Sequence, residues 1–289
     1  MSVSTETPGA PAATATLGAW DRMRVHLGRP MILRLISLLV VIAIWQLIGA
    51  GKPYSVTQPS AIFTAAGHVL FSQVLPAFGS TLKAFGAGFG LSAALGVPIG
   101  LLMGQSRLAE VALRPYVSAL YATPRVALIP VVMLWAGLAF KLQLTVAVLF
   151  GIFPIILNTY IGVKEVPRNF SDAGIAFNAG RWQIMRTVII PGSLHYIFAG
   201  LRIGIGYAMI GTVVAEIEAS VVGIGNLMSL FGQELKVSDM WVPLILLGLF
   251  SVLLSVILKW LERWATMPWM RGKLTDDEGS PATMALGAQ

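Results

Sequence analysis

Residues 172–182 read DAGIAFNAGRW, and residues 188–191, which close the same segment, read VIIP. This compact, charged insert has the composition of short helices and separates two long apolar stretches of the chain. Because charged side chains are costly in hydrocarbon, the insert is predicted to lie in water beside a membrane.

The composition of the whole chain also indicates a membrane protein. Of its 289 residues, 56% are hydrophobic and 11% are charged, whereas soluble domains contain about 25% charged residues. A chain this poor in charge cannot cover itself with a wetted surface, so it is predicted to be integral to a bilayer. The net charge of +7 comes from scattered single bases, which excludes a nucleic-acid-binding stripe. The absence of cysteine excludes disulfides and thiolate metal sites.

Apolar segments that cross roughly 30 Å of hydrocarbon need about 20 helical residues. The predicted spans are residues 31–50, 82–103, 126–138, 142–163, 197–214 and 241–258. The third is extended at its start by the less apolar residues 116–123 and is interrupted by Pro124 and Pro130. Such breaks are tolerated where neighbouring helices satisfy the freed backbone groups. The predicted count is six, with five or seven as alternatives.

Lysine and arginine indicate the orientation, because they concentrate in cytoplasmic loops. They gather before the first span, between the second and third, between the fourth and fifth, and after the sixth. The opposite loops hold only Lys52, Lys141 and Lys236, with Lys83 at a border. Both termini and the loop 164–191 are therefore predicted to be cytoplasmic.

The two ends of the chain are polar and rich in small residues. Residues 1–30 are predicted to be a disordered cytoplasmic tail, residues 31–264 a transmembrane domain, and residues 265–289 a flexible cytoplasmic tail. The first span could instead be a secretory signal, but its apolar run exceeds the 7–15 residues of a signal core. An uncleaved first span is the favoured interpretation.

The insert is predicted to start with a short helix after Pro167. Ser171 or Asn169 would cap this helix, Asp172 would lie in its first turn near the positive end of the helix dipole, and the helix would reach about Phe177.

A bend and a second helix are predicted to follow. Asn178 should adopt a positive φ, with Gly180 helping the turn, and Arg181 should start a second helix that ends at Pro191. Phe177, Trp182 and Met185 would then be available to enter the groove of a partner. The alternative is an interfacial loop with amphipathic helices and no partner.

The spacing in the insert resembles the Glu-Ala-Ala-x-x-x-Gly-(x)9-Ile-x-Leu-Pro loop of bacterial ABC importer permeases, which docks onto their ATPase subunits. Residues 122–130 (ATPRVALIP), 151–159 (GIFPIILNT), 200–202 (GLR) and 214–216 (VAE) look like the branch that includes nitrate, taurine and alkanesulfonate permeases. The resemblance covers about residues 80–261. Three positions depart from the pattern, because Asp172 replaces Glu, Gly174 replaces Ala and Asn178 replaces Gly. Asn is the usual non-glycine residue at a left-handed position.

The resemblance implies an all-α integral membrane protein with the type-I permease fold, about six transmembrane helices and two short cytoplasmic coupling helices. It implies that the docking loop, residues 164–191, couples to the ATPase. The coupling residues carried over are Asp172, Ala173, Gly174, Phe177, Asn178, Gly180, Arg181 and Pro191.

The implied partners are two ATP-binding ABC subunits, an extracytoplasmic substrate-binding protein, a second permease copy and the bilayer of the bacterial inner membrane. ATP and Mg²⁺ would bind the ATPase and not this chain. In agreement, the sequence contains no Gly-x-x-x-x-Gly-Lys-Ser/Thr phosphate loop. The chain is therefore not predicted to be an enzyme.

Two other functions compete with that of an importer subunit. An ion-coupled secondary transporter would use intramembrane acids or His, but the predicted spans are nearly free of acids. A membrane-embedded enzyme would need clustered titratable residues, but His26, His68 and His195 lie in separate segments.

The sequence does not decide the roles of three charged residues and several glycines within the apolar segments. Arg125, Arg202 and Glu216 either line a pathway or pair structurally. Close helix packing is predicted at three sets of glycines spaced by four, which are 86 with 90, 96 with 100 and 104, and 200 with 204. The transported substrate is not specified by the sequence.

Overall fold

The computed structural model describes residues 30–51, 57–219 and 222–278. The chain divides into two compact units, Met1–Ala61 and Ile62–Gln289. The predicted tail 1–30 lies outside the described residues apart from its last position. In the first unit, helix α2 (Pro30–Gly51) confirms the predicted first span. The indole Nε1 of Trp45 donates to the Thr57 carbonyl at 2.8 Å, and Gln46 Nε2 donates to Gln58 Oε1 at 3.0 Å. These bonds fasten the chain after α2 to the end of that helix.

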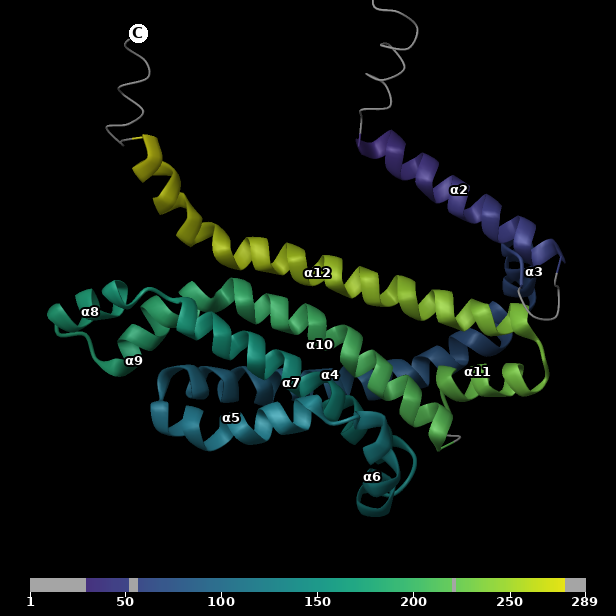
Figure 1. The fold of residues 1–289 in the computed structure, drawn as a ribbon, viewed down its shortest axis with the longest axis horizontal. Helices are drawn as coiled ribbons and strands as arrows, with labels where there is room; N and C mark the ends of the chain where they lie inside the picture. The colour runs from purple at the N-terminus through teal and green to yellow at the C-terminus, as the bar shows by residue number, and fades with distance from the viewer. Residues whose placement is uncertain (1–29, 52–56, 220–221, 279–289) are drawn as a thin grey trace, which may run out of the picture. The chain divides into compact units, whose positions relative to one another are not determined.

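The described part of the second unit is helical throughout (Figure 1). Its elements are α3 (Pro59–Val69), the π-helical turn η1 (Leu70–Val74), α4 (Leu75–Gln105), α5 (Arg107–Ala122), the 3₁₀ turn η2 (Arg125–Leu128), α6 (Ile129–Ala136), α7 (Phe140–Glu165), α8 (Arg168–Ala176), α9 (Arg181–Ile184), the π-helical turn η3 (Met185–Ile189), α10 (Ile190–Glu218), α11 (Ile224–Gln233) and α12 (Val237–Glu278). Five helices of the described chain are long and apolar enough to cross a membrane, and α5 with α6 makes a sixth if that bent pair is one span.

The middle of the second unit is formed by α4, α7 and α10, packed side by side along small residues (Figure 1). Gly96, Gly100 and Gly104 of α4 face α7, and a Cβ built on Gly100 would lie only 2.6 Å from Thr159 Cβ. On the other side of α7, a Cβ on Gly204 of α10 would lie 2.8 Å from Ile155 Cγ1. Both predicted close contacts are thus confirmed. The predicted contact at Gly86 and Gly90 is wrong, because a Cβ on either would meet nothing within 4 Å.

The order of these contacts establishes the direction of the helices. Gly96 of α4 meets Ile155 of α7, Gly100 meets Thr159, and Gly104 meets Val163, so residue numbers rise together and α4 and α7 are parallel. The intervening chain must therefore return to the side of the membrane on which α4 began. Since α5 and α6 form that connection, they are one broken span, and the described chain has six spans when α2 is included.

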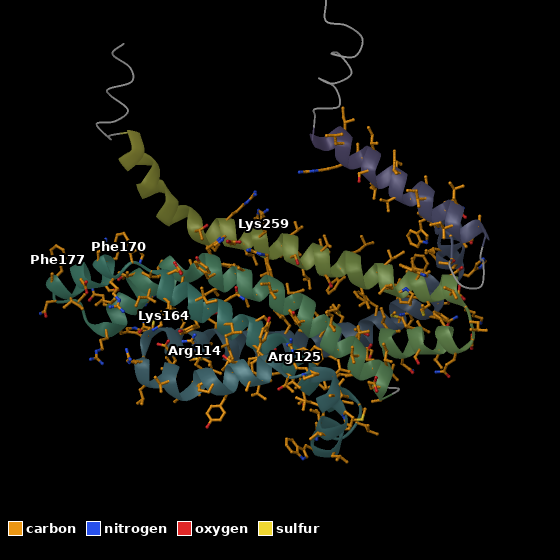
Figure 2. The ribbon with its side chains drawn as sticks, in the orientation of Figure 1. Arg114, Arg125, Lys164, Phe170, Phe177 and Lys259 are labelled. Atoms are coloured by element: carbon orange, nitrogen blue, oxygen red, sulfur yellow. The ribbon has the colours of Figure 1, made fainter. Side chains whose placement is uncertain are left out.

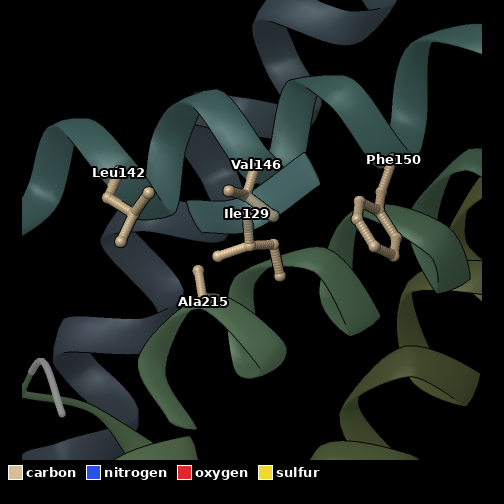
Figure 3. Close-up of a cluster of buried hydrophobic side chains, with 5 residues drawn as sticks. All are labelled: Ile129, Leu142, Val146, Phe150 and Ala215. Carbon is tan, nitrogen blue, oxygen red and sulfur yellow. The ribbon is translucent and has the colours of Figure 1, made fainter. Parts of the chain in front are cut away.

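The break in the third span is a bend of 97° between α5 and the segment Arg125–Ala136. Thr123 and Pro124 are both extended there, with ψ of 137° and 93°. For Thr123 the reason is that a residue before proline is disfavoured in the helical region. After the bend, Ile129 at the start of α6 packs into a buried cluster with Leu142, Val146 and Phe150 of α7 and Ala215 of α10 (Figure 3). This cluster holds the second half of the broken span against its neighbours.

Two other spans are longer than predicted, because helical structure continues through a proline in each. The second span is a continuous helical segment from Pro59 to Gln105, and the fifth runs from Arg181 to Ala219. In each, a π-helical turn lies just before a proline at the start of the next α-helix: η1 before Pro76, and η3 before Pro191. A proline in the first turn of an α-helix needs no N–H, so the wider turn lets helical structure continue through it.

The last span also differs from its prediction. Helix α12 has 42 residues and continues to Glu278, past the predicted end of the transmembrane domain at residue 264. The flexible cytoplasmic tail stays a prediction. Residues 279–289 lie outside the described residues.

Candidate functional site

The docking loop leaves α7 at Pro167, and its first helix starts immediately afterwards. Pro167 is extended, and its carbonyl accepts a hydrogen bond from the Phe170 N–H at 3.2 Å. The predicted capping by Ser171 or Asn169 is wrong, because no side chain caps α8. Asp172 is accordingly the fifth residue of α8 and does not lie in its first turn. Proline has no N–H that would need a partner, so the helix can begin one residue after it.

The bend after α8 is confirmed at the predicted residue. Asn178 has a φ of +59°. The Asn178 N–H donates to the Ile175 carbonyl at 2.8 Å, and the Ala179 N–H donates to the Gly174 carbonyl at 2.9 Å. This pair of bonds is the Schellman arrangement, which satisfies the last carbonyls of a helix when the following residue is left-handed. The bond from the Phe177 N–H to the Ala173 carbonyl, 3.1 Å, closes the preceding turn.

The two glycines of the loop have different tasks, and that of Gly180 is not the one predicted. Gly180 is extended, with φ of −65°, and its carbonyl accepts the Ile184 N–H at 3.0 Å, so it starts α9 and does not form the turn. Gly174 faces the second helix, where a Cβ would lie 3.1 Å from Ile184 Cγ1. The glycine that stands in the family's alanine position therefore lets α8 approach α9 closely.

The second helix of the loop was predicted to end at Pro191, but it continues beyond that residue. Arg181 starts α9, but α9, η3 and α10 form one continuous helical segment that reaches Ala219. The Ile190 N–H donates to the Met185 carbonyl five residues earlier, which carries the helix past the proline. The predicted second coupling helix is thus the N-terminal end of the fifth span.

The loop presents large apolar side chains that the described chain leaves uncovered. Phe177 is 88% exposed and Trp182 is 73% exposed. Ile175 and Phe170, which sequence reasoning missed, are also exposed. Figure 2 shows Phe170 and Phe177 at the α8 end, beyond the packed helices. Met185 was predicted to be available to a partner. Its Sδ instead contacts this chain, 3.1 Å from Gln105 Nε2 of α4. Exposed apolar clusters on a polar segment are typical of a surface that binds a partner.

A charged cluster that the sequence did not reveal anchors this end of the protein. Glu110 in the first turn of α5 accepts hydrogen bonds from the Tyr160 hydroxyl at 2.5 Å and from Lys164 Nζ at 2.7 Å, both on α7. Arg114 lies 3.7 Å from the same carboxylate. Figure 2 shows Arg114 and Lys164 on these neighbouring helices. Lys164 lies in the last turn of α7 and is the first residue of the docking loop, so the cluster fixes the point from which the loop departs.

Arg125 lies at the bend of the third span, beside the middle of α7 and α10 (Figure 2). Its Nη1 donates to the Phe150 carbonyl at 2.8 Å. That carbonyl lacks its usual helical donor, because the residue four positions later is Pro154. The guanidinium carbon is 5.3, 5.2 and 4.8 Å from the ring centres of Tyr121, Phe150 and Tyr207. None of the ion pairs among the described residues includes Arg125.

Arg202 forms an ion pair, which is the structural pairing that was the alternative to lining a pathway. Its Nη1 donates to Oε2 of Glu262 on α12, a residue that the sequence did not single out. Oε1 of the same buried carboxylate lies 2.6 Å from His195 Nδ1. The pairing fastens α12 to α10.

Glu216 is fully buried and holds the start of α11. Its Oε2 accepts from the Gly225 N–H at 2.8 Å and from Thr81 Oγ1 at 3.1 Å, while Oε1 accepts from Gln143 Nε2 at 3.1 Å. Gly223 lies against the carboxylate, where any Cβ would overlap it. The network therefore connects α4, α7, α10 and α11. Within the described ranges, no group of three or more His, Asp or Glu residues is placed to hold a metal ion.

Six apolar spans, one of them broken, and an exposed helical loop define a multi-pass α-helical membrane protein. Residues 96–266, more than half of the chain, match the family described as "Binding-protein-dependent transport system inner membrane component". The chain belongs to this family of ABC transporter permeases.

Individual relatives agree with this assignment and with the predicted branch. The chain is 27% identical over 247 residues to the bicarbonate transport system permease protein CmpB of Synechococcus elongatus, covering 81% of this chain and 89% of that protein. It is 26% identical over 237 residues to the nitrate import permease protein NrtB of Synechocystis, covering 78% and 86%. Its structure is similar to an inward-facing MetNI methionine ABC transporter, with a TM-score of 0.61 at 16% identity over 69% of this chain and 99% of that chain. The last likeness confirms the fold.

Proposed function

We propose that this chain is the transmembrane subunit of an ATP-driven importer and couples to separate ATPase subunits through the docking loop. The observation that carries the proposal is the exposed surface of Phe170, Ile175, Phe177 and Trp182 on a polar loop. The Schellman bend at Asn178 turns α8 back toward α9, so that both helices present apolar side chains at one end of the molecule. A groove on an ATP-binding subunit would cover these side chains.

The complete assembly proposed here has two permease copies, two ATP-binding subunits and an extracytoplasmic binding protein that delivers a small solute. ATP and Mg²⁺ would bind between the ATP-binding subunits. The names of the two relatives above, a bicarbonate and a nitrate permease, support an import role without identifying the solute of this chain. Closure of the ATPase pair would move α8 and α9, and the continuous helix from Arg181 to Ala219 would transmit that movement into the fifth span.

The test is a double substitution in the docking loop. Asp172→Lys with Phe177→Ser should leave insertion intact, because neither residue lies in a span, but the permease should no longer copurify with its ATP-binding subunit. The ATPase activity of purified membranes should fall with it. Leu235→Ser is the matched control, since Leu235 is 76% exposed in the turn between α11 and α12 at the other end of α10.

Copurification of the double variant at the wild-type ratio would contradict the proposal. Loss of the ATP-binding subunit in the Leu235→Ser control would contradict it as well, because the effect would then not be specific to the docking loop.

A further inference from the structure

A groove between α10 and α12 has no role in the function proposed above. It has a volume of about 330 Å³, which lies within the range of ligand-binding sites in proteins. Gly206 of α10 lines it, and a Cβ at this position would meet nothing within 4 Å, so the space beside Gly206 is open. Its α12 wall includes Val252 and Val256, one turn apart and largely exposed. The groove, called the slot below, is thus an open depression whose surface is mainly apolar.

One end of the slot is positively charged. Arg202 and Lys259 line it there, while the neighbouring Glu262 is shared between Arg202 and His195. Lys259 is exposed on α12 (Figure 2), and no ion pair among the described residues includes it. Arg202 uses only Nη1 in the side-chain hydrogen bonds of the described chain. Two cations and one shared carboxylate leave this end with excess positive charge and free N–H donors.

The charged end lies where a bilayer changes from hydrocarbon to headgroups. Lys259 comes directly after the apolar segment 241–258, and Val256 and Val252 lie one and two turns further into that segment. Phosphate groups of lipids occupy this boundary, and basic pockets between transmembrane helices bind anionic headgroups. A guanidinium can also form two parallel hydrogen bonds to a phosphate.

We propose that this groove binds one anionic phospholipid, with its phosphate between Arg202 and Lys259 and an acyl chain along Gly206, Val252 and Val256. The site does not depend on the docking loop or on the importer's solute. Under the predicted orientation it belongs to the cytoplasmic leaflet, because α12 ends on the side of the docking loop.

The test measures lipid retained by the full-length permease. The chain is reconstituted in vesicles of equal phosphatidylglycerol and phosphatidylcholine, extracted in mild detergent, and analysed by native mass spectrometry. Lys259→Gln should reduce retained phosphatidylglycerol about fivefold, the factor given by roughly 1 kcal/mol per basic residue near a membrane. Gly206→Leu should reduce it by at least as much with every charge in place, because the new side chain fills the slot.

Two controls on α4 match these changes. Lys83→Gln removes an exposed cation, and Gly90→Leu fills open space on another face; both should retain phosphatidylglycerol as the wild type does. The proposal is overturned if Lys259→Gln retains as much phosphatidylglycerol as the wild type, or if phosphatidylcholine is retained equally well. It is also overturned if Gly206→Leu separates two copies of the chain without changing lipid retention, since the groove would then be an interface.

Discussion

At the scale of single residues, Arg125 shows how a charge can be held within a span without an acid. Insertion scales assign about 2.5–3.5 kcal/mol to an arginine at the centre of a membrane helix. A contact between a cation and an aromatic ring contributes roughly 0.5–2 kcal/mol, and Arg125 has three such contacts besides its bond to the Phe150 carbonyl. These contacts offset the free-energy cost of placing the guanidinium within a span. Arg125 is therefore interpreted as a support for the bend of the third span.

This interpretation predicts that Arg125 and Pro154 are coupled. Arg125→Met should destabilise the purified permease in the natural background, because a buried acceptor without a donor costs about 1–3 kcal/mol. In a Pro154→Ala background the loss should be smaller by about 1–2 kcal/mol, since the substituted alanine supplies the missing helical N–H. Thermal unfolding of the four proteins in detergent measures the difference. Arg125→Lys, which keeps a charge and a donor, is the control. An equal loss of stability from Arg125→Met in both backgrounds would show that Arg125 does not stabilise the protein through the Phe150 carbonyl.

The sequence was sufficient to predict the conformation of Asn178 but not the partners of the charged residues. The difference is that the first depends on local chemistry and the second on contacts between distant segments. The positive φ of Asn178 follows from local chemistry, because asparagine tolerates the left-handed region and the helix must turn. The hydrogen-bond partners of Arg125 and Arg202 are 25 and 60 residues away in the chain, and the most distant partner of Glu216 is 135 residues away. Contacts at such separations depend on how spans pack, which residue spacing does not specify.

At the scale of elements, the spans were recognisable but their lengths were not. Helix α7 ends within two residues of the predicted span, because its ends are marked by a change in polarity. The second and fifth spans extend beyond their predicted starts because helical structure continues through Pro76 and Pro191. The contact stripe on α4 was also misplaced at one end. It follows Gly88, Ser92, Gly96, Gly100 and Gly104 at a constant spacing of four, and Gly86 and Gly90 lie two residues out of that register.

The stripe predicts opposite effects for one substitution at two glycines of the same helix. Gly90→Ala should stabilise the protein by roughly 0.5–1 kcal/mol, because alanine is the better helix residue and its Cβ meets nothing. Gly100→Ala should destabilise it by about 1–3 kcal/mol, because its Cβ would press on Thr159 and the backbone of α7. Thermal unfolding in detergent compares the two variants, and a gain in stability at Gly100 would show that α4 and α7 can separate without cost.

At the scale of the whole molecule, the remaining prediction concerns orientation. The helix from Arg181 to Ala219 crosses the membrane once, so Gln183 in the docking loop and Leu235 between α11 and α12 must lie on opposite sides. The distribution of Lys and Arg predicts that Gln183 is cytoplasmic. In this cysteine-free chain, Gln183→Cys should react with an impermeant maleimide only after cells are opened. Leu235→Cys, the control, should react in intact cells. The reverse pattern would invert the proposed topology.

The unbroken helix from Arg181 to Ala219 also has a mechanical consequence. Its 39 residues correspond to a rod about 58 Å long, at 1.5 Å per residue. Such a rod acts as a lever with its fulcrum in the packed middle, where Gly204 lies against α7. A tilt of about 5° about Gly204 moves the Arg181 end by about 3 Å and the Ala219 end by about 2 Å, in opposite directions. A sideways push on Trp182 would therefore arrive at Glu216 reversed in direction, and Glu216 would carry the start of α11 with it through its bond to Gly225.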